Sequence, residues 1–393
     1  MKTIFAGASI LALAIAAPAF AQSTPTQCVG AANNCSVVDQ SGSGQIAGVT
    51  QDGANDDSSI TQAGADNAAS VIQTGIVGNL SNVTQSGTVA TQGNFVEVNQ
   101  SDSGAAIVDG DYANTSFIEQ TAGLNEAYVT QVSDSEGLID TTSNASSVQQ
   151  TGTANYAEVG QYGGALVSQV TQTTTGNYAD VNQGSPGATV LAFGNTSEIT
   201  QGGGDNNFAV VTQREEFGQF SVFNNSDITQ DGAGNLANVR QRGAQSNSTI
   251  NQAGDTGEAV VLQTGINNAD PSESFINQAG NGSLAYVEQV GVSNTSTVNQ
   301  AFADDGTTVT FGNNNDADVF QRGDNNTSLI TQGEGNGNIA FVFQEGDNNA
   351  STIAQLGSTN EANVRQFSNG NTSFVSQDGT GNTANVTQGS MPQ

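Results

Sequence analysis

The sequence contains no histidine and no tryptophan, and it has only two cysteines and five prolines among 393 residues. Histidine is the usual group for acid–base chemistry near neutral pH, and neither cysteine has a visible base to activate it. Paired carboxylates such as Glu215–Glu216 lie in segments typical of turns and loops, where solvated acids are common. The chain is therefore not expected to be an enzyme or to bind a cofactor.

The same shortage argues against a bound metal. A zinc site needs closely spaced Cys and His ligands, and there is no second cysteine pair. The segments Gly323-Asp-Asn-Asn326 and Gly346-Asp-Asn-Asn349 offer oxygen ligands, but the nonapeptide pattern of calcium-binding β-rolls is absent. Weak calcium binding at the surface is the most that these segments predict.

Positive charge is scarce as well. Six Lys and Arg stand against 37 Asp and Glu, which gives a formal net charge of −31. Nucleic acid would be repelled, so nucleic-acid binding is excluded. Acidic residues between the repeated positions, such as Glu97, Asp180 and Asp227, are expected to keep separate molecules soluble until salt screens them.

Long apolar runs are missing except at the N-terminus. Lys2, the apolar segment from Ile4 to Ala17 and the final Ala19-Phe-Ala21 predict a secretory signal peptide at residues 1–21. No membrane span is expected once it is cleaved. Residues 22–33 form a short polar lead, and two cysteines in an exported chain indicate a Cys28–Cys35 disulfide.

What the chain has in abundance is one heptad, repeated across residues 34–388. Anchored on its final Gln, the heptad occurs 28 times, with Val or Ile two positions before the Gln in every copy. Four positions before, Ser and Ala alternate with Val96 as the single exception, and six positions before, 21 of the 28 copies carry Asn. The unit is therefore a Ser-type and an Ala-type heptad, present 14 times, with residues 389–393 left as a C-terminal tail.

The constant residues of the heptad occupy alternate positions, which is the period of a β-strand with one buried face. The residues between them vary freely, as on a solvated face. The commonest connections, such as Asp378-Gly-Thr-Gly381, have the composition of turns. We predict an all-β fold, a cross-β solenoid of about 14 stacked two-strand β-arch rungs, about 65–70 Å long at about 4.8 Å per rung.

Stacking would place each side chain over its equivalent one rung later. Buried amides are costly when unpaired, so Gln over Gln and Asn over Asn are expected to form ladders along the axis. The outward aromatic residues, among them Phe95, Phe117, Tyr128, Tyr156, Tyr178, Phe208 and Phe341, are expected to be scattered over the surface.

The paired heptads Asn-X-Ser-X-Ile-X-Gln-X-Gly and Asn-X-Ala-X-Val-X-Gln-X-Gly resemble the curlin repeat, for instance from Asn224 to Gln241 and from Asn371 to Gln388. The resemblance covers essentially all of Asn34 to Gln388. It implies a subunit of curli, the extracellular amyloid fibre of bacterial biofilms. It also implies export through the periplasm, passage through an outer-membrane secretion pore, nucleation by a minor subunit, and a role in adhesion.

The resemblance implies stacking roles in the fibre core for the inward amides. The residues assigned to that role are Asn67, Gln73, Asn79, Gln85, Asn224, Gln230, Asn235, Gln241, Asn326, Gln332, Asn371, Gln377, Asn382 and Gln388.

Two functions follow from the predicted solenoid. Nothing in the sequence caps its ends, and the last heptad, Asn382 to Gln388, keeps the full pattern, so an end can serve as a template for another copy. A self-assembling extracellular fibre subunit is the leading hypothesis. The alternative is a monomeric secreted adhesin or ligand-binding solenoid, which would need a flat outward array of one residue type, whereas the outward positions here are mixed.

Overall fold

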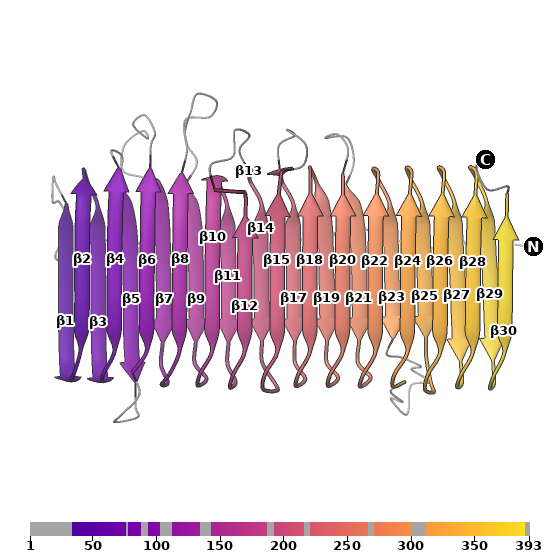
Figure 1. The fold of residues 1–393 in the computed structure, drawn as a ribbon, viewed down its shortest axis with the longest axis horizontal. Coiled ribbons are helices and arrows are strands. Elements are labelled where there is room, and N and C mark those ends of the chain that lie inside the picture. Colours follow the sequence, from indigo (N-terminus) through magenta and orange to yellow (C-terminus); the bar gives the residue numbers. More distant parts are fainter. Residues whose placement is uncertain are drawn as a thin grey trace, which may run out of the picture.

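A computed structural model of the chain describes residues 34–75, 78–87, 93–102, 112–133, 143–186, 192–215, 221–265, 271–300 and 312–389. These residues form 30 β-strands and no helix (Figure 1). The predicted signal peptide at residues 1–21, the lead at residues 22–33 and all but the first residue of the tail lie outside the described residues.

The Ser-type heptads build one sheet, which we call the Ser sheet. Its 14 strands lie side by side in the order in which they occur in the chain. They are β1 (Cys35–Ser43), β3 (Asp57–Ala65), β5 (Asn79–Gly87), β7 (Asn114–Gln120), β9 (Asn144–Gln150), β11 (Val167–Gln172), β14 (Thr196–Gln201), β17 (Asn225–Gln230), β19 (Ser246–Gln252), β21 (Ser272–Gln278), β23 (Thr295–Gln300), β25 (Thr327–Gln332), β27 (Ala350–Leu356) and β29 (Thr372–Asp378).

The Ala-type heptads build the second sheet, the Ala sheet, whose main path also follows chain order. Its strands are β2 (Ile46–Gly53), β4 (Ala68–Gly75), β6 (Phe95–Asp102), β8 (Glu126–Ser133), β10 (Tyr156–Gly164), β12 (Tyr178–Gln183), β15 (Phe208–Arg214), β18 (Leu236–Arg242), β20 (Glu258–Thr264), β22 (Leu284–Val290), β24 (Asp316–Arg322), β26 (Ile339–Glu345), β28 (Glu361–Phe367) and β30 (Thr383–Gln388). Two short strands, β13 (Ala192–Phe193) and β16 (Ser221–Val222), pair beside the end of β10.

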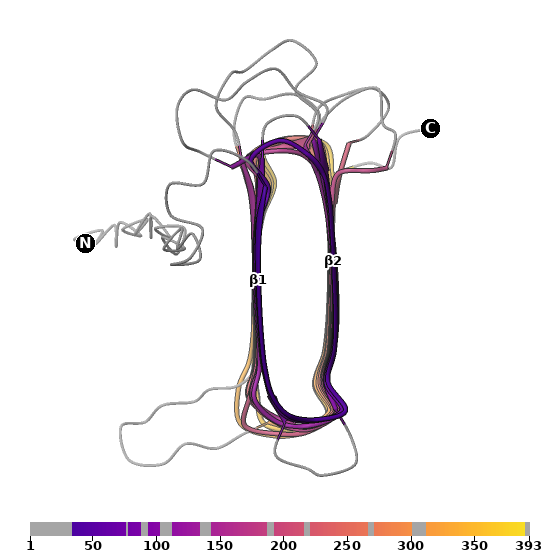
Figure 2. The same ribbon diagram turned by 90° about the vertical axis from the view of Figure 1, so that its left-hand side faces the viewer.

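Every strand of the two main paths pairs in parallel with the strand of its own type one rung away, in register. Gln40 lies beside Gln62 and Val49 beside Val71, for example. The chain alternates between the two sheets, so that the end-on view shows two long facing walls joined by arches (Figure 2). The predicted cross-β solenoid of two-strand rungs is confirmed.

The core lies between the two walls. Val and Ile two positions before each Gln pack in a continuous column, and in the interior rungs they are fully buried, as Ile60 and Val71 are. All Ile residues at this position belong to the Ser sheet, opposite Val in the Ala sheet. Ser and Ala beside them are small enough to let the sheets approach.

Several of the four-residue arches have a left-handed backbone at two positions. In the arch of residues 345–348, Gly346 has φ 103° and Asn348 has φ 59°. At the equivalent Gly357, whose φ is 90°, an added Cβ would lie 2.1 Å from the carbonyl oxygen of Gly379 in the next rung. Glycine is therefore needed there both for the turn and for close stacking of arches.

Candidate functional site: the amide ladders and the open ends

The buried Gln side chains form the most regular feature of the interior. In the Ser sheet, Nε2 of Gln62 donates to Oε1 of Gln85 at 2.8 Å, and in the Ala sheet Gln73 donates to Gln100 at 2.9 Å. The same Nε2 of Gln73 also donates to the carbonyl oxygen of Asp57 on the facing sheet, at 3.0 Å. Each Gln thus joins two rungs and both sheets.

The Gln ladders are continuous and have a direction. The Ser-sheet ladder runs from Gln40 to Gln377. The Ala-sheet ladder runs from Gln51 to Gln388. At every step the Nε2 group donates toward the C-terminal end, and aligned hydrogen bonds of this kind strengthen one another.

The Asn residues stack, but with a different bond from the expected one. The Oδ1 atom of Asn67 accepts the backbone N–H of Asn94, and Oδ1 of Asn326 accepts that of Asn349, both at 3.0 Å. Direct amide-to-amide contact occurs at a few places, as from Asn114 to Asn79. Asn makes this bond because of its place in the rung. Each Asn ends an arch, where its Oδ1 accepts the first backbone N–H of the adjoining rung.

The other Asn residues assigned to stacking make the same kind of contact. Oδ1 of Asn224 accepts the N–H of Ser246, and Oδ1 of Asn235 accepts that of Gly257. Asn371 and Asn382, in the last rung, donate back to Asn349 and Asn360. All of these bonds lie within one molecule, and a role between molecules stays a prediction.

A further ladder, at the arches, was not predicted from the sequence. Oδ1 of Asp347 accepts the N–H of Asp324, whose own Oδ1 accepts the N–H of Val292. Asp255, Asn281 and Asn313 form a similar series. One oxygen of each carboxylate that the sequence offers to calcium, at Asp324 and Asp347, thus accepts a backbone N–H. The recurrence of Asp or Asn third in the arch is the signal that could have found this ladder.

No described residue covers either end of the solenoid. Val38 in the first rung is 46% exposed, whereas its equivalent Ile60 in the second rung is 0% exposed. At the last rung, Nε2 of Gln377 and of Gln388 bonds only a carbonyl of the facing strand among the described residues. At the first rung, no described residue donates to Oε1 of Gln40 or Gln51. One end thus offers donors where the other offers acceptors.

The backbone has the same polarity. The N–H of Glu361 in β28 donates to the carbonyl of Asn382, the residue before β30, at 2.8 Å, so residues at outward positions bond toward the C-terminal rung. In a parallel sheet, alternate residues of a strand bond to opposite neighbours. The outward residues of β29 and β30 therefore present N–H and C=O groups to the space beyond the last rung.

An aspartate on each outer face has a raised pKa, Asp180 on the Ala sheet and Asp227 on the Ser sheet. Burial, and to a smaller extent Glu158 beside it in the preceding rung, raise the pKa of Asp180 to about 6. Burial likewise raises the pKa of Asp227 to about 6, with Glu198 one rung away as the second cause. The smaller, coulombic part of both pKa shifts comes from in-register stacking, because it repeats a carboxylate at the rung spacing.

We expect the solenoid to be more stable at pH 4.5 than at pH 7.5. A folded pKa near 6 lies above the unfolded value of 3.8, so the folded state binds the proton more tightly and gains stability as pH falls from about 6 to about 4. The double variant Asp180→Asn/Asp227→Asn should raise Tm at pH 7.5 and flatten the dependence. Asp39→Asn in the exposed first rung is the control, and equal pH slopes for all three proteins would contradict the prediction.

The outward aromatic residues are not all scattered, which corrects the sequence interpretation. Phe95, Tyr128, Tyr156, Tyr178 and Phe208 form one row on the Ala sheet, with successive ring centroids 5.5, 5.5, 4.9 and 4.6 Å apart. Phe341 contacts Phe320, which contacts Tyr286. Parallel register brings together rings that long connections separate in the sequence. Phe117 lies on the Ser sheet.

The predicted disulfide is described at one of its two residues. Cys35 is disulfide-bonded, and Cys28 lies outside the described residues. In the described part of the chain, no segment forms a helix long and apolar enough to span a bilayer.

Comparison with known proteins places the repeat in a family. The curlin associated repeat matches the chain three times, at residues 312–345, 340–367 and 360–389. No curated protein matches the chain. The matched residues carry β24 to β30, which continue the same two sheets and the same Gln ladders as the preceding strands. Residues 312–389 of the chain are thus similar to the curlin associated repeat.

Proposed function

We propose that the chain is the structural subunit of an extracellular, curli-like amyloid fibre that grows by end-to-end stacking of solenoids. The observation that carries this proposal is the complementarity of the two open ends. Donors of Gln377 and Gln388 terminate one end, and acceptors of Gln40 and Gln51 terminate the other.

Head-to-tail docking would continue every column of the solenoid. The partner's first rung would supply Oε1 atoms to the last Gln of each ladder, and its β1 and β2 would accept the open backbone edges of β29 and β30. The exposed Val38 would gain an aliphatic neighbour like those that bury Ile60. A heterologous contact that does not close on itself produces an open filament.

The similarity of residues 312–389 to the curlin associated repeat supports the biological setting of such a filament. A family of structural proteins fits a non-catalytic role, and the setting we propose is the cell surface, reached by secretion through the periplasm. There the fibre would support biofilm matrix, adhesion and cell aggregation. A nucleating subunit and an outer-membrane secretion pore are the partners that this route requires.

The test is to incubate the purified chain from Gln22 onward, alone, and to follow thioflavin fluorescence and fibre diffraction. We expect fibres with a meridional repeat of about 4.8 Å, and sonicated fibres should remove the lag phase. A folded monomer that persists at high concentration and in high salt would instead favour the secreted adhesin, and would contradict the fibre.

A further inference from the structure

The two outer faces of the solenoid differ in chemistry. The mature chain has five arginines, and all five lie on Ala-sheet strands at outward positions. They are Arg214, Arg240, Arg242, Arg322 and Arg365. No strand of the Ser sheet carries Arg or Lys. Seven of the eight aromatic ring contacts among the described residues also join Ala-sheet strands.

We propose that the outer face of the Ala sheet is a lateral interface, on which a second copy of this solenoid packs face to face with the same polarity. The inference rests on the proposed fibre, because it describes how two growing filaments pair. The proposed partner is a second copy of this chain because the residues of the face are complementary to the same face of another copy.

Self-complementarity follows from a two-fold axis parallel to the filament. Each strand then lies against the same strand of its partner, running the opposite way, so the first outward residue meets the last. In β24, Asp316 meets the partner's Arg322, and in β15, Phe208 meets the partner's Arg214. In β22, Leu284 meets the partner's Val290. Ion-pair, cation–π and apolar contacts are each made twice.

The same alignment avoids every clash of like charge along the main path. Acids at the first outward position of a strand would face the partner's Val132, Thr264, Arg322 or Phe367. Acids at the second outward position would face the partner's Asn99, Gly160, Asn182 or Phe320. Antiparallel pairing over the full length would instead oppose Glu126 to Asp316 and Arg214 to Arg242. Like charges opposed across an interface are unfavourable, so the parallel arrangement is preferred.

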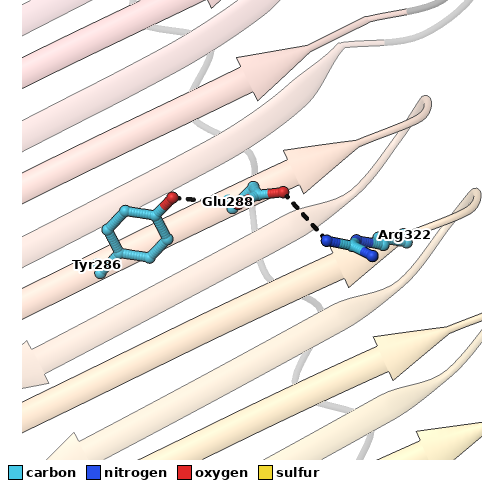
Figure 3. A network of polar contacts seen from close by, with 3 residues as sticks. All are labelled: Tyr286, Glu288 and Arg322. Atoms are coloured by element: carbon cyan, nitrogen blue, oxygen red, sulfur yellow. Dashed lines mark hydrogen bonds and ion pairs between the residues drawn. The ribbon is translucent and has the colours of Figure 1, made fainter.

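The groups on this face have capacity for further contacts. Figure 3 shows Tyr286, Glu288 and Arg322 on the outer surface, where Glu288 accepts a hydrogen bond from Tyr286 at 3.1 Å. Its ion pair with Arg322 spans 3.7 Å, and the Arg322 side chain stays 55% exposed. An exposed ion pair contributes little, and a guanidinium has five N–H donors, so Arg322 can still bind the partner's Asp316.

The face is also large enough. Strands of about seven residues at about 3.3 Å per residue and 14 rungs at about 4.8 Å give a face of about 1,500 Å². Stable protein interfaces bury about 800 Å² on each partner.

A charge exchange tests the pairing. Wild-type fibres are expected to consist of paired filaments, and Arg322→Asp, which places an acid opposite the partner's Asp316, should halve their mass per length while thioflavin-detected growth continues. The double variant Asp316→Arg/Arg322→Asp should restore pairing. Glu288→Gln removes the same intramolecular ion pair as Arg322→Asp but leaves the interface contact, so it should keep paired filaments. Thr327→Asp, on the Ser sheet, controls for added charge.

Several results would overturn the pairing while leaving the fibre intact: unpaired wild-type filaments, pairing that Arg322→Asp leaves unchanged, or opposite filament polarities seen with an N-terminal gold label. If no fibres grow, the fibre proposal itself fails. Sedimentation of the soluble chain then tests the lateral interface. A wild-type dimer that Arg322→Asp converts to a monomer supports this interface, and a wild-type monomer overturns it.

Discussion

Elongation is expected to slow strongly at the C-terminal end of a filament when the subunit carries Phe374→Pro and Asn385→Pro. Both residues are outward in the last rung, and their N–H groups point beyond it. Proline is tolerated where a strand N–H faces solvent, so the chain itself should still fold. Each substitution removes one intermolecular hydrogen bond, worth about 1 kcal/mol net, and inserts a ring between rungs. Growth should slow at least about tenfold.

The double-proline subunit keeps its N-terminal end, so it should still add to wild-type filaments and then block them. Substoichiometric amounts are therefore expected to shorten wild-type fibres, as measured by electron microscopy and thioflavin kinetics. Phe374→Thr/Asn385→Thr keeps both N–H groups in a residue suited to strands and serves as the control. Unimpaired growth of the proline variant would contradict end-to-end stacking.

The second large effect is expected from Gln230→Glu, in the middle of the Ser-sheet ladder. Nε2 of Gln230 donates to Oε1 of Gln252 at 2.9 Å and to the carbonyl of Phe208 at 3.2 Å. Glutamate has the same shape but loses both donors and places a buried negative charge against two oxygens. A buried charge without a partner costs about 3–5 kcal/mol. We expect a lowered Tm and little fibre formation at neutral pH.

The matched control is Thr229→Glu, one residue earlier on the same strand and on its outward side. An outward substitution of this kind should change stability by no more than about 0.5 kcal/mol. Denaturant unfolding of both variants gives the comparison. Similar losses for the two would mean that the column of buried amides does not hold the rungs together.

The period of the sequence was enough to predict the inward and outward faces, the in-register parallel stacking and the Gln ladders. This follows because a strand has only two faces and because Val or Ile at every copy, as at Ile60 and Val71, leaves one choice for the core. Gln has a side chain long enough to reach its equivalent one rung away, so its ladder is set by register alone.

The details that depend on arch geometry could not be predicted in the same way. Asn67 sits at the end of an arch, and whether its Oδ1 meets a side chain or a backbone N–H depends on the left-handed residue Asp66 before it, which has φ 55°. The aromatic row escaped because Phe95 and Tyr128 stand at different heptad positions and become neighbours only diagonally, across adjacent strands. The buried hydroxyls of Ser81 and Ser116, which have no hydrogen-bond partner among the described residues, show that Ser is used here for its small size.

The number of rungs carried by one chain has a mechanical consequence. Within a molecule, successive rungs are joined by covalent arches as well as by hydrogen bonds, whereas the contact between two molecules is entirely noncovalent. With 14 rungs per molecule, a filament of this chain would contain one such seam about every 67 Å. Breakage under tension and the loss of material from a damaged fibre should therefore occur in steps of a whole subunit.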